Sequence, residues 1–323
     1  MTTNQIAKFG CRLAVTIGAA VAPFVCHAAW PERPIKLITG FAPGGGADGV
    51  ARALSDAMSK KLGTPVIVEN RPGAGTTVAA TFTARAPADG YTLMLLTTTN
   101  TISPSMYKSL PYKADSDFTL IGSVAKGPMV IAVSKESGIT SLSQLLEKAK
   151  KDPGKIDYGA GGVGTTPHLA ALVLEKDAGI KMTNIPYKGG SETSAALIGN
   201  QIQAQFGTPP AVAPIVGRAN ILAVTTARKS DLFPGVPTVA ETVKGYDVSS
   251  WYGVGGPAGI PADVVQKIST AIEAAVADPA LKKHLTILGL EPFSSTPQVT
   301  KKMYLDELKR WSSIVSSAGL TAD

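Results

Sequence analysis

Three glycine-rich stretches of the sequence each stand between an apolar run and the start of a helical pattern. They are residues 41–48, 161–168 and 186–190. Glycine lets the backbone approach a ligand closely, and the unpaired N–H groups at the start of a helix are donors for an anion. One such loop is a weak signal in a chain with 33 glycines, but its recurrence is stronger. The pattern favours a site that binds an acidic small molecule through backbone amides.

The first loop also fits part of a dinucleotide-binding fingerprint. Gly44, Gly46 and Gly49 have the glycine spacing of that motif, and Glu69 follows at about the distance of its acidic residue. From this loop alone, a dinucleotide site and a plain strand-to-helix turn both remain open.

Residues for nucleophilic or metal chemistry are scarce. The sequence contains no Gly-x-Ser-x-Gly elbow and no His-Glu-x-x-His motif, which disfavours a secreted α/β hydrolase. Apart from His27, the histidines are His168 and His284, too few for a metal cluster. We therefore expect a protein that is not an enzyme, with no catalytic residue, metal or cofactor. His168 is expected to pack, or to donate a hydrogen bond, at the start of its helix. Lys188 either supplies charge to an acidic ligand or is a solvated loop residue.

The amino terminus has the pattern of an export signal. Lys8 and Arg12 precede an apolar run, residues 13–26, and small residues suit cleavage after Ala28. We expect residues 1–28 to be a signal peptide and the protein to be periplasmic. Both cysteines lie in this segment, so the mature chain would have no thiol. No later stretch offers about 20 uninterrupted apolar residues, the length of a membrane span.

Charge gives a weaker indication. The sequence has 31 Lys and Arg against 24 Asp and Glu, a formal charge of +7. The excess is spread along the chain, without a dense basic run of the kind that marks a nucleic-acid or membrane surface. Composition therefore mildly favours acidic small ligands and predicts no nucleic-acid partner.

Apolar, β-branched runs alternate with helical stripes along the chain. We expect strands at residues 35–41, 65–69, 91–96, 130–133, 155–160, 181–185, 202–206 and 221–225. This alternation favours parallel sheets covered by helices, and the length suggests about two domains. In a parallel sheet, the polar run 97–100 would share the carboxyl edge with the first loop, where ligands of such sheets bind. Stripes after residue 262, among them Tyr304, Leu308, Trp311 and Val315, predict terminal helices packed on the first domain.

With these motifs in place, the chain resembles the solute receptors of tripartite tricarboxylate transporters, the TctC-like or Bug-like periplasmic binding proteins. The resemblance covers essentially the whole mature chain. Its motifs stand at residues 30–35 (WPERPI), 43–48 (PGGGAD), 68–75 (VENRPGAG), 86–93 (APADGYTL), 168–170 (HLA), 186–190 (PYKGG) and 236–241 (VPTVAE). Each is unspecific alone, whereas their joint order is specific and displaces the dinucleotide interpretation.

The resemblance implies a two-lobed periplasmic binding protein type II fold. Each lobe would be a mainly parallel sheet flanked by helices, with lobe 1 formed by residues 29–126 and 251–323 and lobe 2 by residues 127–250. Two crossings near Ala125 and Ser250 would act as the hinge. A monomer would capture a small carboxylate in the interlobe cleft and deliver it to the membrane components of a tripartite tricarboxylate transporter. The alternative is a sensory co-receptor that presents the carboxylate to a signalling protein.

The family's binding positions can be carried onto this chain. The first wall of the cleft would be Ala42, Gly44, Gly45, Asp48 and Thr98, and the second Gly161, Gly164, Thr165, Thr166, His168, Tyr187 and Gly189. We expect Asp48 to order its loop as an N-cap, because a carboxylate facing a bound anion would repel it. Gly207 is a departure, since many relatives carry Asp there, and its presence puts an amino-acid ligand in doubt.

Overall fold

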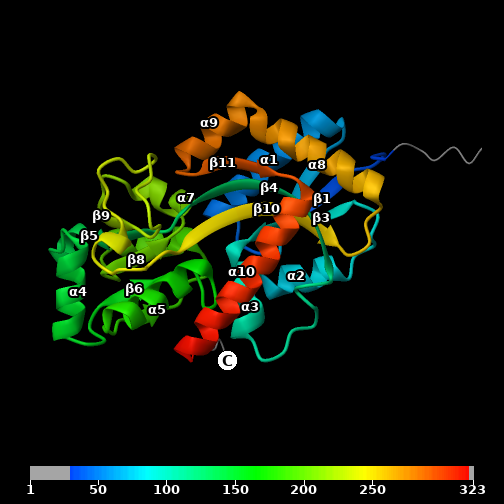
Figure 1. Cartoon of the computed structure of the whole chain (residues 1–323). Coiled ribbons are helices and arrows are strands. Elements are labelled where there is room, and N and C mark those ends of the chain that lie inside the picture. The colour runs from blue at the N-terminus through cyan, green and yellow to red at the C-terminus, as the bar shows by residue number, and fades with distance from the viewer. Residues whose placement is uncertain (1–29, 320–323) are drawn as a thin grey trace, which may run out of the picture. The chain divides into compact units, whose positions relative to one another are not determined.

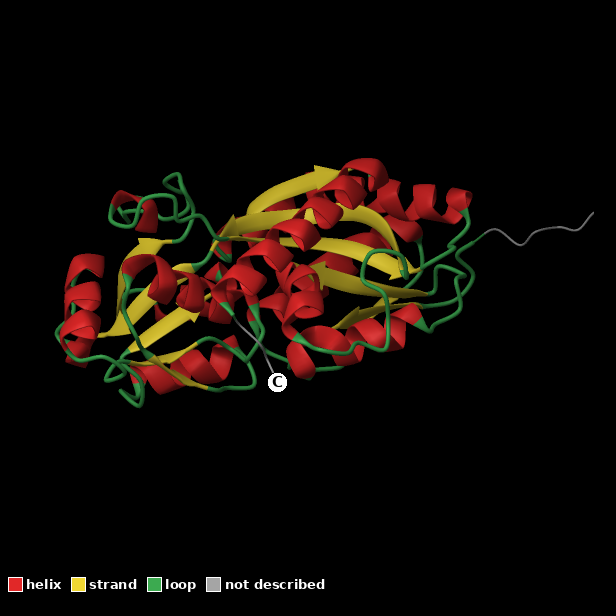
Figure 2. Ribbon diagram, turned by 60° about the horizontal axis from the view of Figure 1, so that its bottom comes forward, coloured by secondary structure: helices red, strands yellow, loops and turns green. Residues whose placement is uncertain are grey.

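Two β-sheets, each flanked by helices, make up the computed structural model, which describes residues 30–319 (Figures 1 and 2). The first sheet has the strand order β11-β4-β10-β3-β1-β2 and the second the order β7-β6-β8-β5-β9. We call the first sheet with its helices lobe 1 and the second sheet with its helices lobe 2. From Pro31 onward the described residues form one compact unit. The expected signal peptide, residues 1–28, lies outside the described residues.

The elements alternate along the chain much as the sequence predicts. Lobe 1 contains β1 (Ile35–Thr39), α1 (Gly46–Leu62), β2 (Val66–Asn70), α2 (Thr77–Ala84), β3 (Thr92–Thr97), α3 (Thr98–Met106), β4 (Phe118–Pro128), β10 (Ser249–Pro257), α8 (Ala262–Ala277), α9 (Pro279–Ile287), β11 (Glu291–Ser295) and α10 (Pro297–Ala318). Lobe 2 contains β5 (Val130–Ser134), α4 (Leu142–Lys151), β6 (Asp157–Gly159), α5 (Thr166–Ala178), β7 (Thr183–Ile185), α6 (Gly190–Ile198), β8 (Ala204–Gly207), α7 (Pro209–Val212) and β9 (Ala219–Val224). Every strand expected from the sequence is present within a few residues of its expected bounds.

Both sheets are mixed rather than mainly parallel, which corrects one detail of the expected fold. In lobe 1, β1 runs parallel to β2 and β3, whereas β10 runs antiparallel to β3 and β4. In lobe 2, β6 runs parallel to β7 and β8, whereas β5 runs antiparallel to β8 and β9. The strands that arrive from the other lobe, β5 and β10, run against the strands built by local crossovers in their sheets. At the edge of lobe 1, β11 also runs antiparallel to its neighbour β4.

The chain passes between the lobes on two adjacent strands. β4 ends at Pro128 and β5 begins at Val130, so one residue, Met129, separates the two sheets at the outward crossing. The return crossing is β10, which pairs with β4 along its length (Figure 1). In this ladder Tyr252 lies opposite Ala125, and Ser250 lies opposite Gly127. The predicted hinge positions therefore lie on neighbouring strands. The hinge motion and the residue limits of the lobes stay predictions.

Helix α10 packs on lobe 1, as expected from the sequence, and also on lobe 2. Tyr304 in its first half belongs to the buried cluster that holds Ile38 and Met94 of lobe 1. Trp311 and Val315 in its second half belong to the buried cluster of lobe 2. The helix has 22 residues and is therefore about 33 Å long, enough to reach past one lobe.

Within residues 30–319, no helix combines the length and apolar character that a membrane crossing requires.

Candidate ligand-binding site

A cavity of about 100 Å³ lies between the two lobes. The three glycine-rich stretches of the sequence all contribute to its wall, through residues 41–43 and 45–47, residues 160–161 and 165–167, and residues 189–192. Further wall comes from residues 97–99 after β3, 206–208 after β8, and 250–252 on β10. Such a volume holds a few water molecules or a small organic acid. The loop at the end of one strand and the start of the following helix is thus the recurring unit of the site.

Three helices begin at this cavity without a side-chain cap. The N-cap residues of α1 and α6 are Gly45 and Gly189, which have no side chain to offer. The N-cap of α5 is Thr165, whose hydroxyl donates to the carbonyls of Ala160 and Gly162, at 2.9 and 2.8 Å, instead of capping the helix. The uncapped N–H groups of α1 and α6 and the positive ends of three helix dipoles make this cavity suited to an anion. At α5 the N–H of Thr166 donates to Thr99 and Pro167 has no N–H, so this helix contributes mainly through its dipole.

Lobe 1's glycine loop is held in place by Asp48. Its Oδ2 accepts hydrogen bonds from Gly44 N–H at 3.0 Å and from Arg52 Nε at 2.8 Å, and its Oδ1 accepts one from Asn70 Nδ2 at 2.8 Å. Burial alone would raise the pKa of Asp48, but these hydrogen bonds outweigh it and lower the pKa. The expected N-cap role is wrong, because Gly45 is the N-cap and Asp48 lies one turn in. Its carboxylate orders the loop from behind and does not line the cavity.

Gly44 has the backbone geometry that glycine alone adopts without strain. Its φ is +78°, in the left-handed region, and the hydrogen bond from its N–H to Asp48 fixes that conformation. The turn directs the following residues, Gly45 to Ala47, toward the cavity.

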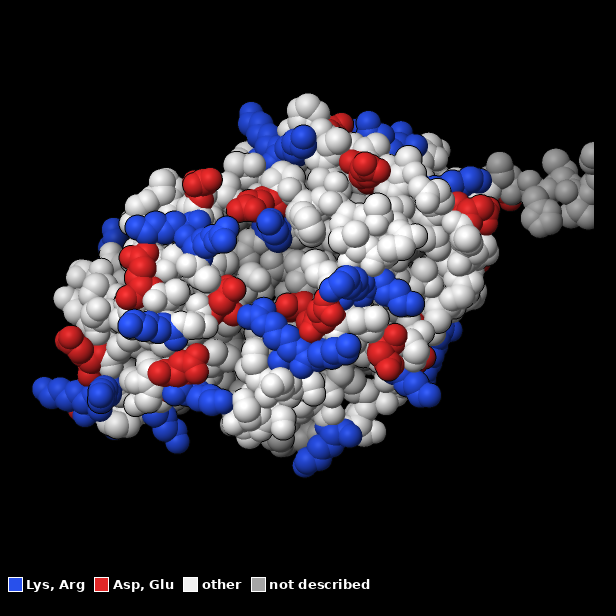
Figure 3. Space-filling view, viewed as in Figure 1, with Lys and Arg blue, Asp and Glu red and all other residues white. Residues whose placement is uncertain are grey.

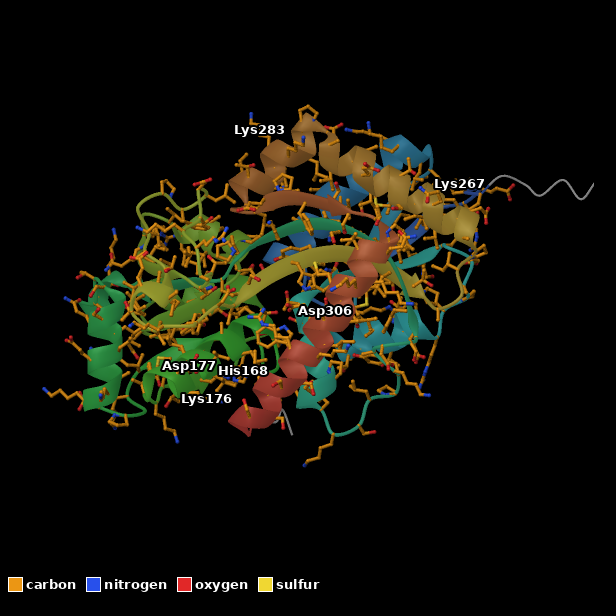
Figure 4. The ribbon with its side chains drawn as sticks, in the orientation of Figure 1. His168, Lys176, Asp177, Lys267, Lys283 and Asp306 are labelled. Carbon is orange, nitrogen blue, oxygen red and sulfur yellow. The ribbon has the colours of Figure 1, made fainter. Side chains whose placement is uncertain are left out.

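His168 has the same supporting role in lobe 2. Its side chain belongs to α5 (Figure 4) and is buried. Its Nδ1 accepts a hydrogen bond from Gly164 N–H at 3.3 Å. Burial lowers the pKa of His168 to about 4, so the ring is neutral at pH 7. The sequence expectation of packing is confirmed, whereas the hydrogen bond at Nδ1 is accepted rather than donated. The His168 imidazole is therefore used to order the glycine loop and does not have the position of a catalytic base.

Threonines join the lobes at the cavity. Thr98 Oγ1 accepts a hydrogen bond from Trp251 N–H at 3.0 Å and so ties α3 to the return strand β10. Thr99 Oγ1 lies 3.2 Å from Thr166 Oγ1 and accepts from Thr166 N–H at 3.3 Å. The second pair crosses from lobe 1 to lobe 2, and all four residues line the cavity.

Direct contact between the glycine loop and lobe 2 closes the cavity. Ser191 Oγ donates a hydrogen bond to the Gly44 carbonyl at 2.7 Å. A methyl group added at Gly46 would lie 2.8 Å from Pro210 Cβ and 3.0 Å from Thr208 Oγ1, which is closer than real Cβ contacts allow. We call this arrangement, in which the two lobes touch at the cavity, the closed form.

The predicted site residues fall into three groups. Ala42, Gly45, Thr98, Gly161, Thr165, Thr166, Gly189 and Gly207 line the cavity. Tyr187 lines an adjoining cavity. Gly44, Asp48, Gly164 and His168 line neither, and they order the two glycine loops from behind. Contact of any of these residues with a ligand stays a prediction.

Several lining residues escape the sequence reasoning, among them Trp251, Tyr252, Thr208 and Ser191. Tyr252 is buried on β10 and hydrogen-bonds Thr208; burial raises its pKa to about 12. The sequence feature that could have revealed Trp251 and Tyr252 is the polar and aromatic character of the return crossing. Its position beside Thr97, however, depends on the pairing of β10 with β3, which no local pattern reveals.

Gly207 leaves no space for a side chain in this structure. A Cβ there would lie 2.7 Å from Val212 Cγ2 and 3.1 Å from Gln205 Nε2. An Asp at this position would require Val212 to shift. Of the described residues that line the cavity, Glu192 is the one with a charged side chain, and it lies in the first turn of α6.

Among residues 30–319, no group of three or more His, Cys, Asp or Glu side chains is placed to hold a metal ion. Charges on the face shown in Figure 3 are mixed, with Lys and Arg beside Asp and Glu.

Two α/β lobes, joined by two crossings and closed over a small cavity, define a solute-binding protein of the type II periplasmic class. The chain belongs to the tripartite tricarboxylate transporter receptor family, which it matches over residues 50–320. That family is one of periplasmic solute-binding receptors and not of enzymes.

Known relatives support this assignment over nearly the whole chain. BugT of Bordetella pertussis is 32% identical, and the match covers 98% of each chain. Among solved structures, the periplasmic binding protein BugD is 32% identical with a TM-score of 0.86, covering 90% of this chain and 99% of BugD. The R. palustris protein Rpa4515, solved with adipate, is 30% identical with a TM-score of 0.87, covering 91% of this chain and 99% of Rpa4515.

Proposed function

We propose that this protein captures a small carboxylate in the interlobe cavity and delivers it to the membrane components of a tripartite tricarboxylate-type transporter. One observation carries the proposal. The uncapped N-termini of α1, α5 and α6, from both lobes, meet at a single cavity whose lining contains no Lys or Arg among the described residues. The adipate bound to the relative Rpa4515 agrees with a carboxylate ligand.

This kind of site suits capture followed by release. Backbone N–H groups and helix dipoles stabilise an anion, and bridging waters complete its coordination at small cost. Because the described residues of the wall include no guanidinium or ammonium group, the ligand is held by several weak contacts that separate together when the lobes open. We propose that the protein works in the periplasm, as the family does and as the amino-terminal sequence predicts.

A ligand screen on the mature protein tests the binding step. Thermal unfolding is measured with mono-, di- and tricarboxylates. At 100 times its dissociation constant, a true ligand raises the unfolding free energy by about 2.7 kcal/mol. Amines and sugars of similar size serve as negative controls. If no carboxylate raises the melting temperature, the proposed function is wrong.

The Gly45→Val variant tests the location of the site. A Cβ at Gly45 would meet Ala42 O at 3.4 Å, an ordinary distance, so valine fits the fold but extends into the cavity that Gly45 lines. Gly49→Val is the matched control, because it lies on the same helix with its nearest neighbour, Leu288 Cδ1, 3.9 Å away. We expect Gly45→Val to lose carboxylate binding with little change in the melting temperature of the free protein. Equal binding by both variants would place the ligand elsewhere.

Delivery is tested by co-purification from membranes. The ligand-loaded protein is expected to retain the membrane subunits of a tripartite transporter. Retention of a sensor kinase instead would favour the co-receptor role.

A further inference from the structure

A second cavity adjoins the ligand-binding cavity. It has a volume of about 410 Å³ and shares four wall residues with the first, namely Phe41, Ala42, Gly161 and Thr165. We call the smaller one the inner cavity and the larger one the outer cavity. Tyr107 of lobe 1 and Tyr187 of lobe 2 stand on the wall of the outer cavity, with Val163 from the second glycine loop. These rings and the valine provide apolar surface for a methylene chain that leaves the inner cavity.

The two cavities carry opposite charges. Of the described residues, Glu192 is the one charged side chain of the inner cavity, and Lys188 is the one charged side chain of the outer cavity. Glu192 is held in place, because its Oε2 accepts a hydrogen bond from the backbone N–H of Lys188 at 3.0 Å. The Lys188 ammonium group is solvent-exposed, and within the described part of the chain no carboxylate forms a salt bridge with it.

This distribution of charge separates the two ends of a ligand. One carboxylate in the inner cavity is stabilised by the N-termini of three helices. The three helix N-termini can offset the Glu192 charge for one carboxylate, whereas a second carboxylate there would meet this charge with no cation among the described wall residues. In the outer cavity the same group would meet Lys188 and remain partly hydrated.

We propose that the ligand is an elongated dicarboxylate, and that Lys188 recognises its second carboxylate in the outer cavity. The first carboxylate lies at the helix N-termini of the inner cavity, so this inference rests on the proposed function. The carbon chain passes the shared wall near Phe41 and Gly161. Lys188 thus distinguishes dicarboxylates from uncharged analogues of the same length.

Matched pairs of ligands test this assignment. Unbranched dicarboxylates from succinate to suberate are compared by calorimetry with their half-amides, in which one carboxylate is replaced by an uncharged carboxamide of the same shape. We expect the wild type to bind at least one diacid about threefold to fivefold more tightly than its half-amide at low ionic strength. Added salt should reduce this preference, because the Lys188 side chain is exposed.

Three variants connect the preference to Lys188. Lys188→Met is expected to bind the diacid and its half-amide equally, whereas Lys188→Arg should keep the preference. Lys155→Met is the matched control, since Lys155 is also exposed in lobe 2 and lines neither cavity. It should behave as the wild type. Circular dichroism of each variant verifies that it is folded.

The possible failures are distinguishable. If diacid and half-amide bind the wild type equally, or if Lys188→Met keeps the preference, the role of Lys188 is wrong while carboxylate binding still stands. If neither member of any pair binds, this inference fails, whereas the proposed function fails only if no mono-, di- or tricarboxylate raises the melting temperature either.

Discussion

The hydroxyl of Ser191 in lobe 2 donates a hydrogen bond of 2.7 Å to the carbonyl of Gly44 in lobe 1. The N–H of the same glycine donates to Asp48 at 3.0 Å. Both polar groups of Gly44 are therefore used, one to order its own loop and one to join the lobes. The closed form depends on a loop that Asp48 has already shaped, so variants at these positions should separate loop order from lobe closure.

Removing the Ser191 hydroxyl should weaken closure alone. The bond to Gly44 forms between lobes, so Ser191→Ala should lower the stability of the closed, ligand-bound form and leave the free protein almost unchanged. A hydrogen bond of this kind contributes about 0.5–1 kcal/mol, which corresponds to a twofold to fivefold rise in the carboxylate dissociation constant. Calorimetry measures the carboxylate dissociation constant of the variant and the wild type. Ser143→Ala, at an exposed position on α4, should leave affinity unchanged.

Adding a methyl group at Gly46 should hinder closure more strongly. Alanine there would bring its Cβ to 2.8 Å from Pro210 Cβ of lobe 2, whereas alanine at Gly49 meets only Leu288 Cδ1, at 3.9 Å. Forcing such an overlap costs about 1–3 kcal/mol, so we expect Gly46→Ala to weaken ligand binding by about fivefold to 150-fold. Its melting temperature without ligand should not fall, because alanine favours the helix.

The pair Gly46→Ala and Gly49→Ala is compared by calorimetry and by small-angle scattering with saturating ligand. Closure should contract the wild type and Gly49→Ala but not Gly46→Ala. If all three contract equally, the contact between Gly46 and Pro210 does not limit closure.

Loss of the Asp48 carboxylate should disorder the first glycine loop. Asp48→Ala leaves Gly44 N–H, Asn70 Nδ2 and Arg52 without their shared acceptor, which costs about 1–3 kcal/mol of unfolding free energy for the buried groups. Ligand binding should weaken as well, although Asp48 does not line the cavity. Chemical denaturation and calorimetry report the two effects. The control is Asp56→Ala, which removes an exposed carboxylate from the same helix. Unchanged binding in Asp48→Ala would mean that the loop keeps its binding conformation without the hydrogen bonds of Asp48.

The parts of the site that the sequence predicts are those with a local cause. Glycine at Gly45 and Gly189, each placed before a helical pattern, marks a helix N-terminus that is left uncapped, and both glycines line the cavity. The spacing of Val50, Leu54, Met58 and Leu62 predicts α1, and all of these side chains except the half-buried Leu62 are buried. Local periodicity and glycine placement therefore locate the loops and helices of the site.

The remaining parts depend on contacts between distant segments. β4 is an 11-residue strand in which Gly122, Lys126 and Gly127 interrupt the apolar pattern, so its pairing with β10 stabilises it more than its own sequence does. β11 has the sequence EPFSS and pairs only with β4, at the sheet edge. Trp251 and Tyr252 reach the cavity through the same long-range pairing. The mixed sheets follow from these pairings and could not be read from the alternation of strands and helices.

Acid should destabilise the protein through His168. Burial lowers the pKa of its imidazole to about 4, below the value of about 6.5 expected in the unfolded chain. Between these values the unfolded chain binds a proton that the folded protein does not. The stability linked to His168 is therefore complete above pH 6.5 and is lost as the pH falls toward 4. Relative to pH 8, the loss at pH 5 is about 2 kcal/mol.

His168→Asn removes the titrating ring and keeps a side-chain acceptor near Nδ1 for the N–H of Gly164. We expect its unfolding free energy to fall by about 2 kcal/mol less than that of the wild type between pH 8 and pH 5. The measurement is urea unfolding at each pH, and subtracting the variant from the wild type cancels the carboxylates common to both. His284→Asn, at an exposed position on α9, should follow the wild type. A His168→Asn profile parallel to the wild type would show that His168 has the same pKa in the folded protein as in the unfolded chain, which would contradict a pKa lowered by burial.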